Sequence, residues 1–229
     1  MRTFLHAKYR GMIFRSAMKK FIRDPEAAIR DDHRILTRLI YGWGNEGWSA
    51  LEEYLKGSLQ RVAASREPIL ECGSGLSTLL AGIVVQRTGN SLWSLEHERS
   101  WADRVRKYLD AYRIRPAHVI DAPLRDFGDF SWYSVPFEDL PTGFSLILCD
   151  GPPGETRGGR YGLIPVMGKR IKDGAVILLD DAGRPEEQSI AKRWERELKA
   201  TARLCGEQKP YFEIVLPAGS GPTDEYRIS

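Results

Sequence analysis

Residues 69–80, ILECGSGLSTLL, decide how the rest of this chain is interpreted. The pattern predicts a short buried strand, a glycine turn and the first turn of a helix. Gly73 and Gly75 lack a Cβ atom where the backbone must turn tightly and let a ligand come close. Ser77 and Thr78 offer side-chain oxygens to the free N–H groups at the helix start. A strand, a glycine loop and a helix N-terminus in succession predict a nucleotide-type binding site.

The acidic residue before the glycine loop indicates which ligand this site takes. A dinucleotide fingerprint has a third glycine at the position of Thr78. Glu71, two places before Gly73, would repel a pyrophosphate but pair with the cationic head of an amino acid. S-adenosylmethionine carries an ammonium and a sulfonium and no phosphate, so we predict it as the cofactor. Two alternatives stay open, a dinucleotide-binding oxidoreductase and a glycine turn with a structural role alone. The predicted binding set in this stretch is Glu71, Gly73, Ser74, Gly75 and Ser77.

Composition limits the class of protein. A chain of 229 residues suits one domain with an appendage, and a net charge of +3 gives no case for nucleic acid. The three cysteines have no metal-type spacing and are expected to be reduced thiols. The sequence has no apolar run of membrane-spanning length and no signal-peptide core. We therefore expect a cytoplasmic protein.

The first 65 residues predict a helical extension ahead of a domain over 66–229. Residues 1–23 are basic and carry apolar residues near helical spacing, and the first acid is Asp24. Such a helix lies on an anionic membrane surface or packs on its own domain, and we favour packing. Residues 26–65 predict two further helices, joined by a turn at 42–45, with Trp48 on the apolar side of the second.

Strands alternate with helices over the rest of the chain. Expected strands are 69–72, 92–96, 118–120, 144–150 and 175–181, followed by a late antiparallel pair at 202–205 and 212–216. Expected helices are 76–87, 101–112, 161–172 and 185–198. This order predicts an α/β fold with a doubly wound, mostly parallel, seven-stranded Rossmann-like sheet. The fourth and fifth strands are nearly all apolar and should be neighbours covered on both faces.

Residues at the end of the second and third strands complete the predicted cofactor site. Glu96 lies 23 positions after Gly73, where a carboxylate that accepts ribose hydroxyls is expected. His97 follows it and is a candidate to flank the adenine. Ala122 and Leu124, after the third strand, would form an apolar wall for the adenine.

Three aspartates should meet at the carboxyl ends of the fourth and fifth strands. Asp150, Asp180 and Asp181 would repel one another unless a positive group lies among them. Mg²⁺ prefers carboxylate oxygens and would bind and deprotonate a substrate hydroxyl. Without a metal, Asp150 would act as the catalytic base or bind the ammonium of the cofactor. Asp150 in a turn and Asp181 as a helix cap are the structural alternatives.

Taken together, residues 69–81, Glu96, 144–154 and 175–181 resemble a class I S-adenosylmethionine-dependent methyltransferase, over residues 65–217. The acids after the fourth and fifth strands resemble two metal-dependent O-methyltransferase groups, the macrolide-sugar and the catechol types. The catechol type has Asn where this chain has Asp181, so the macrolide-sugar type is the nearer. The resemblance implies O-methylation of a hydroxyl on a small molecule or sugar, with Mg²⁺. A metal-independent methyltransferase of the same fold is the alternative.

The loops after the fourth and fifth strands are expected to contact the methyl acceptor. Arg160, Tyr161 and Arg184 lie there and favour an anionic or polyhydroxylated small molecule. The oligomeric state stays open, with a homodimer among the options.

Overall fold

The computed structural model describes residues 2–30, 33–44 and 50–219. A seven-stranded sheet has the order β3-β2-β1-β6-β7-β9-β8. The strands in this order are β3 (Ala117–Asp121), β2 (Leu92–Glu96), β1 (Ile69–Cys72), β6 (Phe144–Cys149), β7 (Ile171–Leu179), β9 (Tyr211–Val215) and β8 (Thr201–Cys205). The first five run parallel, and β9 is antiparallel to both β7 and β8. The predicted sheet, the pairing of the fourth and fifth strands and the late antiparallel pair are confirmed.

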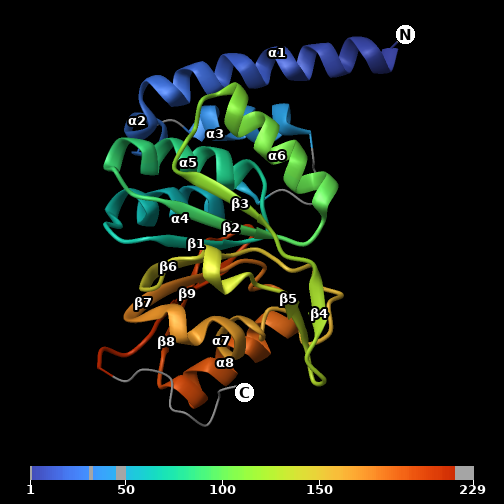
Figure 1. Cartoon of the computed structure of the whole chain (residues 1–229). Coiled ribbons are helices and arrows are strands. Elements are labelled where there is room, and N and C mark those ends of the chain that lie inside the picture. Colours follow the sequence, from blue (N-terminus) through green and yellow to red (C-terminus); the bar gives the residue numbers. More distant parts are fainter. Residues whose placement is uncertain (1, 31–32, 45–49, 220–229) are drawn as a thin grey trace.

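Helices cover both faces of the sheet (Figure 1). One face carries α4 (Glu52–Ala64), α5 (Leu76–Thr88) and α6 (Arg99–Ala111), and beyond these α2 (Pro25–Arg30) and α3 (His33–Trp43). The other carries α7 (Leu163–Met167) and α8 (Pro185–Leu198). Each face has a core of its own, and the central strands β1 and β6 are buried almost throughout. Burial on both faces explains why these strands are runs of apolar residues without alternation.

The N-terminal helix α1 (Arg2–Arg23) lies along α3 as an outer layer (Figure 1). Its inner side buries Phe14, Ala17, Met18 and Phe21, and the Phe14 ring packs 5.8 Å from that of Trp43. The outer side holds Tyr9 and Met12, which are more than half exposed. The favoured prediction for residues 1–23, a basic helix packed on its own domain, agrees with this arrangement.

Two predicted boundaries need correction, one hairpin was not predicted, and two residues named in the sequence analysis lie outside the described residues. The helix expected over 161–172 is shortened to α7, because a 3₁₀ turn (Gly168–Arg170) follows and β7 already begins at Ile171 beside Phe144. A hairpin of β4 (Leu124–Asp126) and β5 (Ser131–Tyr133) was not expected. Helix α3 continues to Trp43, through the first half of the predicted 42–45 turn. Asn45 and Trp48 lie outside the described residues.

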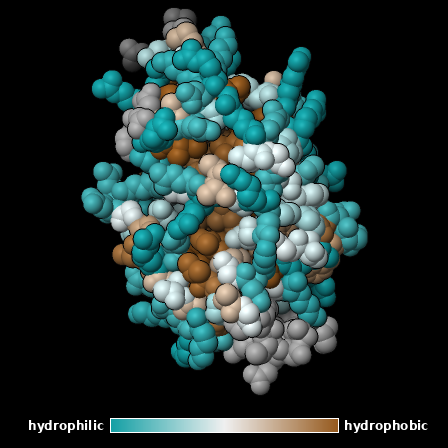
Figure 2. All heavy atoms as spheres, turned by 90° about the vertical axis from the view of Figure 1, so that its left-hand side faces the viewer, coloured by the Kyte–Doolittle hydropathy of each residue, from teal (hydrophilic) through white to brown (hydrophobic). Residues whose placement is uncertain are grey.

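The surface at the left of Figure 1 is mostly hydrophilic, with hydrophobic side chains grouped near its middle (Figure 2). Among the helices that the structure describes, none is long and apolar enough to cross a membrane.

Candidate functional site

The glycine loop after β1 forms one wall of a cavity of about 840 Å³. Gly73 has a φ of +90°, and a Cβ atom there would lie 3.1 Å from the Gly151 nitrogen, so only glycine suits this close approach. Gly75 differs, because a Cβ atom on it would meet nothing within 4 Å. It lines the cavity together with Ser74 and Ser77. The loop therefore needs one glycine for its own conformation, and the other leaves its Cβ space to the cavity.

Glu71 holds this loop from its buried side. Its side chain is 1% exposed and does not line the cavity. Oε2 accepts a hydrogen bond of 2.6 Å from the Thr78 hydroxyl, whose oxygen accepts 2.8 Å from the Gly75 N–H. Burial raises the pKa of the Glu71 carboxyl, and the bond from Thr78 opposes this. The predicted direct pairing of Glu71 with an ammonium group is not part of this arrangement, in which the carboxyl holds the loop.

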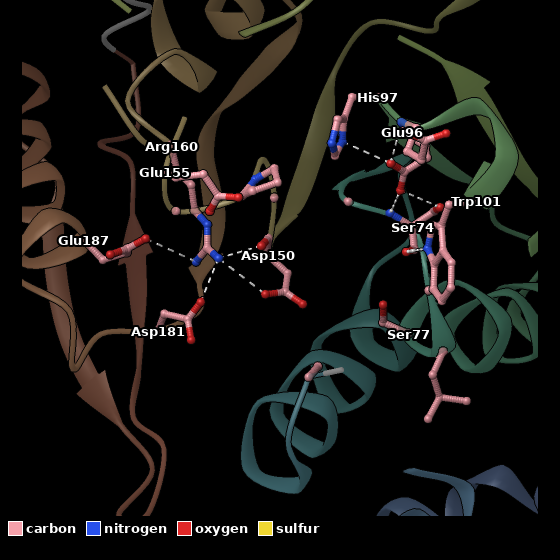
Figure 3. A pocket seen from close by; sticks show the side chains of 18 of the residues that line it. Ser74, Ser77, Glu96, His97, Trp101, Asp150, Glu155, Arg160, Asp181 and Glu187 are labelled. Atoms are coloured by element: carbon pink, nitrogen blue, oxygen red, sulfur yellow. Dashed lines mark hydrogen bonds and ion pairs between the residues drawn. The ribbon is translucent and has the colours of Figure 1, made fainter. Parts of the chain in front are cut away.

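Glu96, at the end of β2, is bound on both oxygens (Figure 3). Oε2 accepts from the Ser74 N–H at 2.9 Å and the Ser74 hydroxyl at 2.8 Å. Oε1 accepts from the Glu98 N–H at 2.9 Å and lies 3.1 Å from His97 Nδ1. Burial alone would raise the pKa of Glu96, but these bonds outweigh it and lower the pKa. Both Glu96 and His97 line the cavity, as their predicted role in cofactor binding requires.

The predicted adenine wall lies elsewhere. Ala122 is fully buried in the core on the α7–α8 side of the sheet, and Leu124 is paired with Tyr133 in the β4–β5 hairpin. Neither residue is among the described residues that line the cavity, whereas Tyr133 and Trp101 both line it. The Trp101 Nε1–H donates to the Ser74 carbonyl at 2.7 Å, which fixes its ring beside the glycine loop. Sequence reasoning missed both aromatics, and Trp101 at the start of α6 was assigned only to a helix.

The opposite wall of the cavity holds the three aspartates, which we name the acid cluster: Asp150, Asp180 and Asp181. One carboxylate oxygen of each lies within 4.8 Å of the others. Asp150 follows β6, and its N–H donates to the Cys72 carbonyl at 3.1 Å, which places it beside the glycine loop. Asp150 and Asp181 line the cavity, but Asp180 is fully buried behind it. The predicted convergence of these residues is confirmed.

Arg160, expected to contact substrate, lines the cavity but is only 2% exposed, and its guanidinium lies among Asp150, Asp181 and Glu187 (Figure 3). Its guanidinium donates to the Asp180 carbonyl at 2.7 Å and to the Asp181 carboxylate at 2.8 Å. It also forms ion pairs with Asp150 and Glu187. Burial would lower the pKa of Arg160, but Asp150 and the other acids raise it strongly. Arg160 is therefore a permanent internal counter-charge.

Lys209, in the turn between β8 and β9, is a second cation on the acid cluster. Its Nζ lies 3.2 Å from Asp180 Oδ2 and 3.0 Å from Asp181 Oδ1. Burial raises the pKa of Asp180, as does Asp150, and Lys209 opposes them. For Asp181, Arg160 and Lys209 outweigh burial and lower the pKa. Sequence reasoning missed Lys209, since no motif marks it and only the pairing of β9 with β7 brings it here.

The donor set does not suit a divalent cation. At least one carboxylate oxygen of each aspartate already contacts Arg160 or Lys209, and Asp181 Oδ2 also lies 3.0 Å from Arg184. Asp180 Oδ1 is buried and has no hydrogen-bond partner. At about 4 Å and an effective dielectric constant of about 20, a divalent cation and an ammonium group repel by about 8 kcal/mol. Carboxylates that lack a counter-charge favour a metal, but these have two internal cations.

The two other predicted substrate residues lie apart. Arg184 is half exposed and lines the cavity beside Asp181. Tyr161 lines a neighbouring hollow of about 670 Å³, which shares Gly154 and Glu186 with the first cavity. There the Arg193 guanidinium lies 3.6 Å above the Tyr161 ring.

Comparison with known proteins connects this fold to methyltransferases. No protein-family model and no curated protein matches the sequence. A solved candidate caffeoyl-CoA O-methyltransferase from Staphylococcus aureus is similar with a TM-score of 0.61 at 11% identity, over 86% of this chain and 98% of its own. A Podospora anserina methyltransferase bound to S-adenosylhomocysteine gives 0.58 at 15% identity, over 76% and 82%.

A Bacillus cereus O-methyltransferase, also in complex with S-adenosylhomocysteine, gives 0.56 at 16% identity, over 84% of this chain and 96% of that one. At these identities the likeness is one of fold. The chain has the Rossmann-like fold of the S-adenosylmethionine-dependent methyltransferases.

Proposed function

We propose that this protein is an S-adenosylmethionine-dependent methyltransferase that acts on a hydroxyl oxygen of a small molecule or sugar. The observation that carries the proposal is the single cavity between the Gly73–Ser77 loop with Glu96 on one side and Asp150 on the other. Ligands of doubly wound sheets bind in this place, beyond the carboxyl ends of the strands. The comparisons support the donor, since two of the similar structures hold S-adenosylhomocysteine.

Ser74, Ser77, Glu96 and His97 would bind the donor. Glu96 would accept ribose hydroxyls at the acceptor site that its three hydrogen bonds leave, or when Ser74 releases an oxygen, because a carboxylate has about four acceptor sites. Trp101 is partly exposed and offers aromatic surface beside it, whereas Tyr133 lines the cavity but is fully buried. Predicted contacts of the donor with Ala122 or Leu124 would need these side chains to reach the cavity and are not included in the proposal.

Asp150 would serve as the base. S-adenosylmethionine, when bound, would supply the methyl group and leave as S-adenosylhomocysteine, and the Asp150 carboxylate would take the proton of the acceptor hydroxyl. Burial raises the pKa of Asp150, against the pull of Arg160, and a raised pKa suits a group that accepts a proton near neutral pH. The Asp150 side chain is 24% exposed on the cavity side, so an acceptor can reach it.

Isothermal titration with S-adenosylhomocysteine tests the donor. We expect saturable binding by the wild type, and binding of NADH instead would favour the dinucleotide-binding oxidoreductase. A screen of hydroxylated acceptors with a homocysteine readout then tests the reaction. Asp150→Asn should retain S-adenosylhomocysteine binding and lower turnover by about 10²-fold or more. Equal turnover of Asp150→Asn and wild type would remove Asp150 as the base.

A further inference from the structure

We infer that the Lys209 ammonium group occupies the place a divalent cation would need in the acid cluster, so that this chain carries a built-in cation instead of a metal. The resemblance to metal-dependent O-methyltransferases implies Mg²⁺ at these aspartates. The contacts of the acid cluster instead place a lysine side chain at these aspartates. This part of the inference does not depend on the proposed reaction.

The Lys209 nitrogen lies against the carboxylates of the acid cluster. It contacts carboxylate oxygens of Asp180 and Asp181 at 3.2 and 3.0 Å, two of the three acids that could hold a metal ion. A metal bound by both would have to share this space with the ammonium group. Asp180 is fully buried, whereas its partner Lys209 is 30% exposed and lines the cavity beside Asp150 and Asp181. A cation that entered from the cavity would meet Lys209 before it met Asp180.

Arg160 is a second cation that contacts the acid cluster, although Asp180 Oδ1 has no hydrogen-bond partner. Arg160 contacts Asp181 Oδ2 at 2.8 Å and Asp150 Oδ1 at 3.5 Å from within the protein. Arg160 is 2% exposed and holds backbone carbonyls of both Asp150 and Asp180. It cannot leave without exposing these acceptors, so a metal would face two cations.

The protein also fixes the turn that carries Lys209. The Glu53 carboxylate, in the first turn of α4, accepts hydrogen bonds from three successive backbone N–H groups, those of Glu207, Gln208 and Lys209, at 2.9–3.0 Å. These bonds lower the pKa of Glu53. A residue anchored in this way brings its side chain to the aspartates without a long flexible tether.

Lys209 also has a donor to spare. An ammonium group has three N–H donors, and two of them are used on Asp180 and Asp181. Lys209 lines the cavity, so the third donor is available to an oxygen of the methyl acceptor. This extension rests on the proposed function and assigns to Lys209 the positioning of the acceptor oxygen that a metal would otherwise perform.

The test measures Mn²⁺ binding by the loss of the free-ion signal in electron paramagnetic resonance. Wild type should bind no Mn²⁺ at the acid cluster. Lys209→Met keeps the length of the side chain and removes its charge, and we expect a gain of at least about tenfold in Mn²⁺ affinity. The gain should disappear in Lys209→Met combined with Asp180→Asn. Lys192→Met, the same change at an exposed site on α8, is the matched control and should leave Mn²⁺ binding as in wild type.

Mn²⁺ binding by the wild type that Asp180→Asn abolishes would overturn the inference, whether or not the Lys209 variants fold. A folded Lys209→Met protein with no gain in affinity would also overturn it. Lys209→Arg keeps a cation and should resemble wild type. Titration of wild type and each variant with S-adenosylhomocysteine separates the two proposals. A wild type that does not bind S-adenosylhomocysteine counts against the proposed function and not against the role of Lys209.

Discussion

Arg160 Nη2 lies 2.8 Å from Asp181 Oδ2, and both side chains are buried, with 2% and 7% of their surfaces exposed. Removal of one partner from a buried ion pair leaves the other charge uncompensated. Arg160→Met should therefore lower the free energy of unfolding by about 3–5 kcal/mol, measured by urea denaturation. Arg157→Met is the control, since its pair with Asp126 is exposed and should contribute about 0–1 kcal/mol. Similar losses in both variants would contradict the assignment of Arg160 as the internal counter-charge.

The two loop glycines should respond differently to alanine. Gly73→Ala places a side chain on a residue with φ +90° and against the Gly151 backbone, so unfolding should become easier by at least about 1 kcal/mol. Gly75→Ala has free space around its Cβ and should keep the stability of the wild type. Because that space belongs to the cavity, its S-adenosylhomocysteine binding should weaken. Thermal denaturation and titration on the same samples test both, and a stability loss in Gly75→Ala alone would reverse our assignment.

Glu96 should control donor binding through its carboxylate, which accepts hydrogen bonds. Glu96→Ala removes the acceptor that Ser74 and the predicted ribose both use, and S-adenosylhomocysteine should bind about tenfold more weakly or worse. Glu138→Ala, on an exposed 3₁₀ turn, serves as the control for loss of a carboxylate. An unchanged affinity in Glu96→Ala would refute the assignment of Glu96 to the donor.

His97 should titrate above its ordinary pKa of 6.5, because Glu96 Oε1 favours its charged form. A raised pKa in the folded state means that the pairing stabilises the protein fully below pH 6.5 and less as pH rises through the folded value. His97 is about one-third exposed, so we expect no more than about 1 kcal/mol. The difference in unfolding free energy between wild type and His97→Gln, measured across pH, tests this. A difference that grows with rising pH would have the wrong sign.

Helix α1 should stabilise the fold through its inner side. Met18 is fully buried, and Met18→Ala should cost about 2–5 kcal/mol of unfolding free energy. Met12, on the same helix, is 55% exposed, and Met12→Ala should change stability by no more than about 0.5 kcal/mol. Guanidinium denaturation of both variants compares the two sides. Equal effects would mean that α1 is not held by this contact, and the membrane-surface alternative would gain weight.

Much of the fold could be predicted because its signals are local. The glycine loop, the apolar runs of β6 and β7 and the proline at the start of α8 each mark an element within a few residues. The three aspartates could be predicted to meet because strand ends are brought together by the sheet itself. The ends of helices and strands could not be predicted as well. Ile171 belongs to β7 because it pairs with Phe144, and its neighbours in the sequence do not indicate this.

The charges of the site could not be predicted in the same way. A loop arginine is usually solvated, and nothing near Arg160 in the sequence distinguishes it from Arg157, which is exposed. Its burial depends on carboxylates that come from β6, β7 and α8 together. Lys209 needs in addition the antiparallel return of β9 along β7. Three adjacent aspartates need a positive group, and here the chain itself supplies it through Arg160 and Lys209.

The hydrogen bonds from residues 207–209 to Glu53 join segments more than 150 positions apart. A chain cut after Asp181 would contain the three aspartates and Arg160 but not the ammonium group that contacts two of them. The acid cluster is therefore complete only when the turn between β8 and β9 is held against the start of α4.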